Sequence, residues 1–331
     1  MSAQPRVWLL LSTRRGDNNQ VLALGEALGV PFETRTILYK RTARLRMKLF
    51  PESVGHVTDA SREWLQPPWP DLVIGIGRRT VPVARWIREQ SGGRARLIRL
   101  GHPRADNRLF DLVITTPQYP VPAAENVVKL PLALNRFRKA PAPTDEEKAW
   151  LDRLPRPHLL LSLGGTAPMW RLDLAALRLA ATKLVRGAER CGGTLIVVGS
   201  RRTPADAYRV AREAAGTSPR VEFVSNQVRF PVLLADADEQ FVTADSVSMI
   251  SEAVLSGKPV GLIPVEPDSR GRRKLGSDPG KSRYRDPRRF WAEVQARGLV
   301  GTVDEPRCGK VDDPVRLAVA AVRQRLGGLF E

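Results

Sequence analysis

The chain has 331 residues, a formal net charge of +18 and 42% hydrophobic residues, which suffices for two domains that each bury a core. No run of about 18 apolar residues occurs, which excludes a membrane-spanning helix, and two cysteines, Cys191 and Cys308, exclude a disulfide framework and a cysteine zinc site. The positive charge favours anionic partners, and because no nucleic-acid-binding motif accompanies it, a phosphorylated substrate or an anionic membrane surface is expected instead.

The beginning of the chain predicts a strand, not a signal peptide. The apolar segment 6–12 ends in arginines without a small-residue cleavage site. The low cysteine content fits a reducing cytoplasm. The run 35–49 has six Lys or Arg and no acid, interleaved with apolar residues, as in segments that lie on anionic membranes. We therefore expect a cytoplasmic protein, peripheral on the inner membrane. A second basic run, 270–289, has nine Lys or Arg against two aspartates, and an ordinary solvated surface is the alternative for both.

Apolar runs alternate with helical patterns in the first half of the chain. The runs are continuous, as expected for parallel strands covered on both faces. Strands are predicted at 6–12, 34–38, 71–77, 95–100, 111–116 and 126–130. The helix after the first strand is expected to be capped by Asp17 or Asn18 and to stop at Gly29.

The pattern restarts after 139–157, a segment rich in proline and charge that we interpret as a linker with a lead-in helix. Strands are predicted at 158–166, 194–200, 221–224, 239–243 and 259–265, with helices at 173–190, 205–215 and 246–256. These patterns predict an N-terminal domain (1–138) and a C-terminal domain (158–311). Both would be doubly wound, Rossmann-like parallel sheets, and they would face a cleft. The last helix, in 312–331, has an apolar stripe and is expected to pack back on the first domain.

Ligands bind at the carboxyl ends of parallel strands, so the loops after the strands are the candidate sites. In the first domain, the candidates are two glycine-containing loops and the polar residues beside them: Gly16, Asp17, Asn18, Asn19, Gln20, Gly75 and Gly77. Asp17 is the first candidate for a general base, and His102, after the fourth strand, is the second. A dinucleotide site is rejected because the third glycine of its motif is missing.

In the second domain, two loops offer phosphate-binding groups. Gly164 and Gly165 would let a ligand approach the backbone, and Thr166 can donate to a phosphate. Arg201 or Arg202, next to Ser200, would reach a diphosphate. Ordinary turn chemistry is the alternative interpretation of both loops.

The segment 241–265 leads from a strand into a helix whose first N–H groups attract an anion. The residues at this helix start are Asp245, Ser246, Ser248 and Met249. Glu252, six residues after Ser246, would accept hydrogen bonds from both hydroxyls of a ribose. This layout predicts a nucleotide-sugar site, although a capped helix with one solvated glutamate is the simpler alternative. No Asp-x-Asp metal pair stands at a strand end, so neither a metal nor a cofactor is expected.

The same segment resembles the donor site of glycosyltransferases with the GT-B fold, including the N-acetylglucosaminyltransferase that makes lipid II. That resemblance implies a diphosphate near Ser246 and Ser248 and a ribose at Glu252. A wider resemblance, to the mitochondrial-fission "elongated mitochondria" family with its GT-B-like architecture, covers most of the chain. It rests on the segments GDNNQVLALGEALG, PDLVIGIGRRT, FDLVITTPQY, LLLSLGGT and FVTADSVSMISEAVLSGKPVGLIPV. Gln118 and Tyr119 stand where many relatives have a His-Asp pair, so a base is not expected there.

Two functions follow. The first is a metal-independent GT-B-type glycosyltransferase that moves a sugar from a nucleotide diphosphate donor to a membrane-associated lipid or envelope glycan. The alternative is a non-catalytic nucleotide-binding or recruitment protein, because plant members of the resembled family help to recruit a dynamin-related protein.

Overall fold

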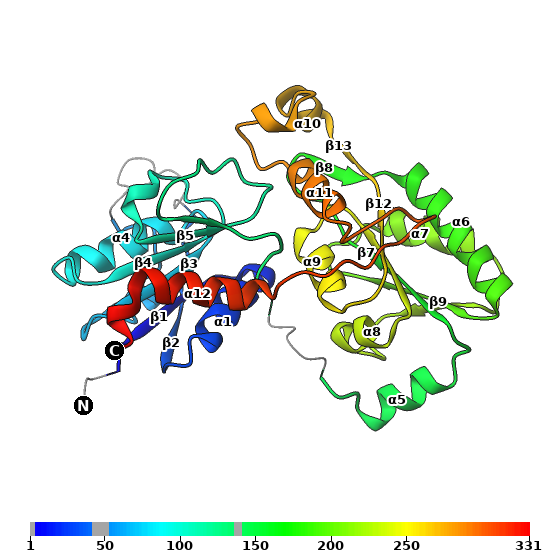
Figure 1. Ribbon diagram of the computed structural model, residues 1–331, viewed down its shortest axis with the longest axis horizontal. Coiled ribbons are helices and arrows are strands. Elements are labelled where there is room, and N and C mark those ends of the chain that lie inside the picture. The colour runs from blue at the N-terminus through cyan, green and yellow to red at the C-terminus, as the bar shows by residue number, and fades with distance from the viewer. Residues whose placement is uncertain (1–3, 42–52, 136–140) are drawn as a thin grey trace. The chain divides into compact units, whose positions relative to one another are not determined.

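The computed structural model describes residues 4–41, 53–135 and 141–331 (Figure 1). The chain divides into one unit made of 1–136 and 312–331 and a second made of 137–311. Each unit is a parallel β-sheet with helices on both faces, which confirms the predicted fold class of two doubly wound α/β domains. In the described residues, no helix is long and apolar enough to cross a membrane.

The sheet of the first unit has the strand order β2-β1-β3-β4-β5-β6, and all neighbours are parallel. Its strands are β1 (Val7–Leu11), β2 (Phe32–Thr36), β3 (Leu72–Ile76), β4 (Arg96–Leu100), β5 (Leu112–Thr115) and β6 (Val127–Lys129). All six predicted strands are present, and only β2 is displaced, beginning two residues before its predicted range. The strand order reverses between β1 and β3, which is where doubly wound sheets bind ligands.

Two helices cover one face of this sheet, α1 (Arg15–Ala27) and α12 (Pro314–Leu326), and α4 (Thr80–Gln90) covers the other (Figure 1). The short elements are α3 (Asp59–Arg62), η1 (Asn107–Leu109) and η3 (Gly327–Leu329). The predicted cap of α1 was wrong. Its N-cap is Arg14, without a side-chain hydrogen bond, because the helix begins before Asp17. The predicted stop is confirmed, since Gly29 follows α1 with a φ of +73°.

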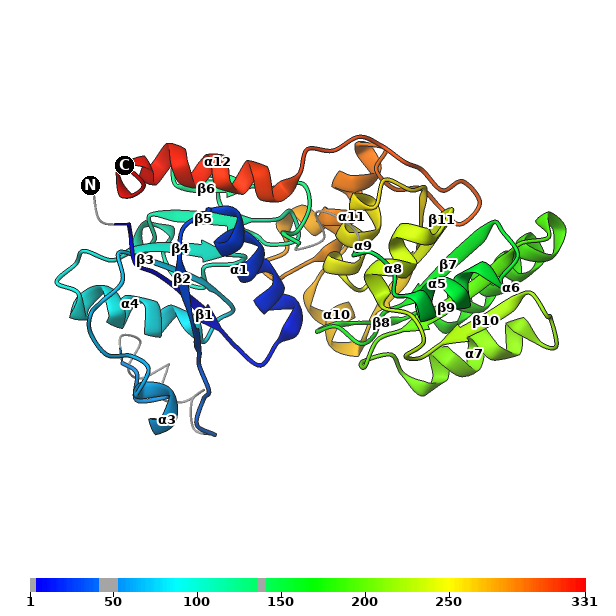
Figure 2. The same cartoon turned by 90° about the horizontal axis from the view of Figure 1, so that it is seen from below.

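Although α12 comes last in the chain, it packs beside α1 (Figure 2). Its buried side chains include Val315, Ala318 and Val322, which join the core formed by α1 and the sheet. Because this core combines the two ends of the chain, the first unit depends on α12 for its stability.

We therefore expect Val322→Asp to destabilise the first unit by more than about 3 kcal/mol, because Val322 is 0% exposed and the new carboxylate would be buried without a partner. Ala320→Asp places the same charge on the exposed side of α12 and should change the free energy of unfolding by less than about 0.5 kcal/mol. Urea unfolding of both variants measures the difference. Equal stabilities would show that the first unit does not need this packing.

The second unit has the strand order β10-β9-β7-β11-β12, again all parallel. Its strands are β7 (His158–Leu163), β9 (Thr194–Gly199), β10 (Val221–Val224), β11 (Glu239–Thr243) and β12 (Val260–Ile263). The order reverses between β7 and β11. A separate antiparallel pair, which the sequence patterns did not predict, joins β8 (Trp170–Leu172) to β13 (Val265–Pro267).

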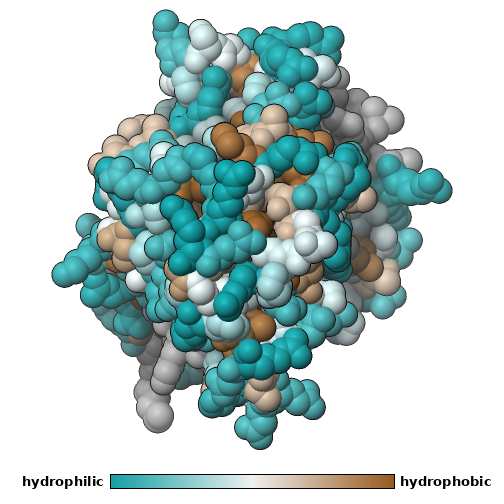
Figure 3. All heavy atoms as spheres, turned by 90° about the vertical axis from the view of Figure 1, so that its right-hand side faces the viewer, coloured by the Kyte–Doolittle hydropathy of each residue, from teal (hydrophilic) through white to brown (hydrophobic). Residues whose placement is uncertain are grey.

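The helices of the second unit are α5 (Asp145–Asp152), α6 (Leu174–Cys191), α7 (Ala205–Ala215), α8 (Phe230–Asp236), α9 (Val247–Leu255), α10 (Ser269–Lys274), η2 (Pro279–Lys281) and α11 (Pro287–Ala296). The predicted helices of this half are present as α6, α7 and α9. In the molecular face drawn in Figure 3, hydrophilic side chains predominate and apolar ones are scattered among them.

The two basic runs differ in how far the structure describes them. Positions 42–49 of the run predicted to lie on a membrane are outside the described residues. Within 270–289, Arg288 and Arg289 have structural roles. Arg288 pairs with Asp286 at 2.7 Å and donates to the carbonyl of Gly276, and Arg289 donates to the carbonyl of Ser282.

Candidate functional site

The candidate site of the second unit lies at its strand-order reversal, where β7 and β11 are neighbours. The loop after β7 begins with Gly164 and Gly165, and the loop after β11 contains Asp245 and leads into α9. Parallel pairing brings both loops to the same edge of the sheet. Residues that are 80 positions apart in the chain therefore come into contact, since Gly165 N donates to Asp245 Oδ2 at 2.9 Å.

Asp245 holds these two loops together. It is 2% exposed, and besides the Gly165 amide it accepts a 2.7 Å hydrogen bond from the Thr243 hydroxyl, which in turn accepts one from Gly164 N. Burial raises the pKa of Asp245. This carboxylate and the Gly165 amide bind each other, which gives both a role in positioning the two loops, and their contact with a ligand stays a prediction.

The two glycines are required for a different reason from the one predicted. A Cβ atom at Gly164 would stand 2.1 Å from Asp245 Oδ1, and one at Gly165 would stand 2.3 Å from the carbonyl oxygen of Arg202. The glycines therefore let the neighbouring loops pack closely. Thr166, directly after them, is exposed.

The loop after β9 is held by Thr203, which the sequence interpretation missed. Its hydroxyl donates to the carbonyls of Leu163 and Gly164 at 2.8 and 2.7 Å and accepts from Ser200 N. The side chains of Arg201 and Arg202 are exposed. The positive charge of Arg202 acts on Asp245, which places Arg202 close to the start of α9.

The N-terminus of α9 remains open. Ser246 is its N-cap and accepts a long hydrogen bond of 3.4 Å from Met249 N. In the described part of the chain, nothing accepts a hydrogen bond from the N–H groups of Val247 and Ser248, and the Ser248 hydroxyl has no partner. These donors and the helix dipole can bind an anion.

Glu252 lies on the same side of α9 as Ser248, because residues four apart face the same way on a helix. Its side chain is half-buried, and burial raises its pKa to about 7. No described group donates a hydrogen bond to its carboxylate or pairs with it. A carboxylate removed from water without a donor is costly, and such groups concentrate at functional sites.

In the first unit, the loops after β1 and β3 come together at the other strand-order reversal. A Cβ atom at Gly77, whose φ is +82°, would stand 3.7 Å from Asp17 Oδ2, so the Asp17 carboxylate lies beside this glycine. Three other predicted residues, Gly16, Gly75 and Asn18, belong to secondary-structure elements or hold the loop by hydrogen bonds. Gly16 lies inside α1, where no tight turn requires it, and Gly75 is inside β3. Asn18 braces the loop by accepting from Ser12 N at 2.8 Å.

Asn19 and Gln20 follow on α1 with half-buried side chains, and no described group hydrogen-bonds to them. At the position of the relatives' His-Asp pair, Gln118 is 4% exposed and Tyr119 packs edge-on against the His102 ring at 6.2 Å.

The surroundings of His102 favour a hydrogen-bond donor over a general base. Its Nδ1 accepts from Arg104 N at 2.9 Å, which leaves the hydrogen of the neutral ring on Nε2. Burial, with the charges of Arg104 and Arg99, lowers the pKa of His102 to about 4. The ring is therefore neutral at pH 7, and its one lone pair already accepts a hydrogen bond.

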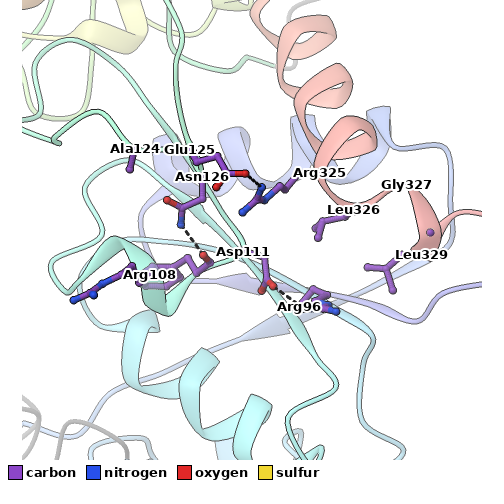
Figure 4. Close-up of a pocket in the computed structure, with 12 residues that line it drawn as sticks. Arg96, Arg108, Asp111, Ala124, Glu125, Asn126, Arg325, Leu326, Gly327 and Leu329 are labelled. Carbon is purple, nitrogen blue, oxygen red and sulfur yellow. Dashed lines mark hydrogen bonds and ion pairs between the residues drawn. The ribbon is translucent and has the colours of Figure 1, made fainter.

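Two hollows lie at the opposite, amino-terminal edges of the sheets. One, of about 890 Å³, is lined by Arg96, Asp111, Glu125 and Arg325 (Figure 4). Its charges are already paired, Asp111 with Arg96 at 3.1 Å and Glu125 with Arg325 at 2.7 Å. The other, of about 830 Å³, contains the Lys183–Asp304 pair. Neither includes a predicted site residue. In the described ranges, no group of three or more His, Cys, Asp or Glu could hold a metal ion.

The family model for mitochondrial fission ELM1 matches residues 15–279 of this sequence. The chain belongs to the mitochondrial fission ELM1 family. Its relatives include mitochondrial fission protein ELM1 of Arabidopsis thaliana, with 29% identity over 237 residues, covering 63% of this chain and 55% of the plant protein. The chain thus spans little more than half of that ELM1 protein. An uncharacterized protein of Rickettsia prowazekii is 23% identical over 304 residues, covering 78% of this chain and 82% of its own length.

Solved structures show that this ELM1-family chain shares its fold with enzymes of nucleotide sugars. The UDP-GlcNAc 2-epimerase of Methanocaldococcus jannaschii aligns with a TM-score of 0.54 and 11% identity, covering 96% of this chain and 99% of its own. A co-structure of S. aureus MnaA with UDP aligns with a TM-score of 0.52 and 12% identity, covering 98% of this chain and 97% of its own. The Neisseria meningitidis UDP-GlcNAc 2-epimerase bound to UDP-GlcNAc aligns with a TM-score of 0.51 and 10% identity, covering 96% of this chain and 100% of its own. The fold is therefore GT-B-like.

Proposed function

We propose that this protein is a metal-independent glycosyltransferase of the GT-B type, which moves a sugar from a nucleotide diphosphate to a membrane-associated lipid or glycan acceptor. The observation that carries the proposal is the unpaired, half-buried carboxylate of Glu252 beside the open start of α9. A half-buried carboxylate without a hydrogen-bond donor is costly to fold. A ligand with hydroxyl donors and a phosphate would satisfy both this carboxylate and the N–H groups at the start of α9.

The donor would lie along α9. Its diphosphate would accept from the N–H groups of Val247 and Ser248 and from the Ser248 hydroxyl, while the two ribose hydroxyls donate to Glu252. Ser248 and Glu252 are separated by about 6 Å along the helix axis, a distance that a ribose with its attached phosphates spans. The exposed side chains of Thr166, Arg201 and Arg202 would bind the outer phosphate.

In the proposed reaction, an acceptor hydroxyl attacks the anomeric carbon of the sugar. The bond from that carbon to the diphosphate oxygen breaks, and its electron pair leaves with the nucleoside diphosphate. The hydroxyl proton passes to a general base, for which Asp17 is the candidate because His102 is a neutral donor. Donors at the start of α9 and the arginines stabilise the charge of the departing diphosphate without a metal ion.

The proposal is tested with the full-length protein and a panel of uridine, guanosine and cytidine diphosphate sugars, starting with UDP-GlcNAc because proteins of this fold bind it. We expect at least one nucleotide sugar to raise the melting temperature. With a membrane extract as acceptor, it should be consumed with release of one nucleoside diphosphate per sugar transferred. Product analysis separates transfer from hydrolysis and epimerisation. If no nucleotide sugar binds, the donor site does not exist, and a recruitment protein becomes the better interpretation.

A further inference from the structure

An arginine is buried in the sheet of the first unit, and no carboxylate of the described residues forms an ion pair with it. Arg99, on β4, is 2% exposed. Its guanidinium donates to the Thr80 hydroxyl at 3.0 Å and to the carbonyl of His102 at 3.0 and 3.3 Å, but these are neutral acceptors. Its pKa falls to about 10 because of burial, so it keeps its charge at pH 7. Buried arginines are normally paired with a carboxylate or a phosphate.

Two exposed arginines converge on the same place. Arg79, at the start of α4, lies 5.2 Å over the ring of Tyr39, and the charges of both Arg79 and Arg99 act on that phenol. Arg104, in the loop after β4, acts on both Arg99 and His102. In the described residues, none of the three arginines forms an ion pair with a carboxylate. The charge of Asp17 also acts on Arg99 and favours its protonated form.

Neutral hydrogen-bond donors complete the cluster. The Tyr39 hydroxyl is buried without a partner, and burial raises its pKa, so it keeps its proton. His102 offers the hydrogen on Nε2, because its Nδ1 accepts from Arg104 N. Tyr39 lies against Arg79, and His102 is joined by hydrogen bonds to Arg99 and Arg104, so these donors border the loops that follow β3 and β4. Like charges that converge repel each other, and an anion bound between them removes that repulsion.

We propose that the first unit binds the phosphate of a phosphorylated ligand between Arg79 and Arg104, above the buried charge of Arg99. Arg79 and Arg104 contact the phosphate oxygens, whereas Arg99 is a positioning residue that supplies positive potential from below and fixes the loop that carries His102. The anion site does not depend on the donor site of the second unit. Its assignment to the acceptor, which would then be a phosphorylated molecule, rests on the proposed transfer.

The test measures binding of inorganic pyrophosphate to the full-length protein by phosphorus NMR, with UDP binding measured in parallel. Arg79→Ala and Arg104→Asn change exposed side chains, and asparagine tolerates the positive φ of position 104. We expect each to weaken pyrophosphate binding about 3- to 10-fold, and Arg99→Met about 10-fold or more, with UDP affinity unchanged within about twofold. Arg108→Gln, at the opposite edge of the sheet, is the matched control and should change neither the pyrophosphate affinity nor the UDP affinity.

Variants of the donor site give the complementary result. Glu252→Gln should weaken UDP binding and leave the phosphate site of the first unit intact. If Arg79→Ala and Arg104→Asn bind pyrophosphate as the natural protein does, or lose UDP binding in parallel, the proposal is wrong. These two variants decide the question even if Arg99→Met fails to fold. A failure of the donor site alone would show as loss of UDP binding with pyrophosphate binding preserved.

Vesicles then identify the source of the phosphate. Vesicles with phosphatidic acid, a phosphomonoester, are compared with vesicles of equal charge that contain phosphatidylglycerol, a phosphodiester. Binding that prefers phosphatidic acid and is weakened by Arg79→Ala supports a lipid headgroup as the ligand. Pyrophosphate binding with no preference between the vesicles supports a soluble phosphorylated ligand. The proposed phosphate site is contradicted if the protein binds both vesicles equally, if Arg79→Ala leaves that binding unchanged, and if pyrophosphate does not bind.

Discussion

Glu252→Gln is expected to weaken UDP binding about 10- to 100-fold and, at the same time, to make the second unit more stable. The loss of binding follows because an amide is a poorer acceptor than a carboxylate for two ribose hydroxyls. The gain in stability follows because the natural carboxylate is half-buried without a donor, and a neutral amide is less costly to bury. Isothermal titration calorimetry and urea unfolding measure the two effects.

Both effects have a defined pH dependence. The pKa of Glu252 is raised from 4.5 to about 7, so the folded protein holds a proton that the unfolded chain has released. The stability of the natural protein therefore falls as the pH rises from about 4.5 through about 7, and the advantage of the variant grows to about 1–3 kcal/mol at pH 8. Because a ribose requires the ionised carboxylate, natural UDP affinity should be about tenfold higher at pH 8 than at pH 6.

The control is Glu189→Gln, which removes an exposed carboxylate near the end of α6. It should change neither UDP affinity nor stability by a measurable amount. If Glu252→Gln binds UDP as well as this control does, the carboxylate does not hold a ribose, and the donor site assigned to α9 is wrong.

Gly164→Ala is expected to destabilise the second unit by about 3 kcal/mol or more and to abolish nucleotide binding. The new methyl group would overlap the Asp245 carboxylate at 2.1 Å, and that carboxylate can move only by giving up its hydrogen bonds to the Gly165 amide and the Thr243 hydroxyl. The start of α9 would then shift away from the loop after β7. Urea unfolding and UDP titration at a temperature where the variant is folded measure both losses.

Gly187→Ala is the matched control. Gly187 lies within α6, and a Cβ atom there would stand 3.9 Å from its nearest neighbour, Leu159 Cδ1. Because alanine restricts the unfolded chain, this variant should be as stable as the natural protein or up to about 1 kcal/mol more stable. If the two variants had equal stability, the contact between Gly164 and Asp245 would not constrain the site.

The candidate sites contain two kinds of residue: those that hold neighbouring loops together and those that are proposed to face a ligand. Asp245, Thr203 and Thr80 are of the first kind. Asp245 and Thr203 are buried or half-buried, and their hydrogen bonds join adjacent loops. Thr80 has the same role in the first unit, between β3 and Arg99. The groups that we propose to face a ligand are instead Glu252 and Ser248 in one unit and Arg79 and Arg104 in the other.

The fold could be predicted from the sequence because its signals are local. Continuous apolar runs at regular spacing define the parallel strands, and the interposed amphipathic patterns define the helices that cover them. The start of α9 was also predictable, since a small polar turn after an apolar strand marks a helix start at the edge of the sheet where ligands bind. The cap of α1 was not predictable, because several polar residues in succession offered equally good caps and the helix began before all of them.

The sequence by itself determined the strands of the two parallel sheets, the main helices of the second unit and the location of a polar helix start before Glu252. Only the tertiary structure decided which of those polar groups remain free, because hydrogen bonds between loops some 80 residues apart occupy Asp245 and the Gly165 amide and leave Glu252 without a donor. It alone placed Arg79, Arg99 and Arg104 together, since their strands and loops become neighbours only when the sheet forms. Periodicity records which side of an element is buried, whereas hydrogen-bond partners and unpaired charges depend on contacts between elements distant in the chain.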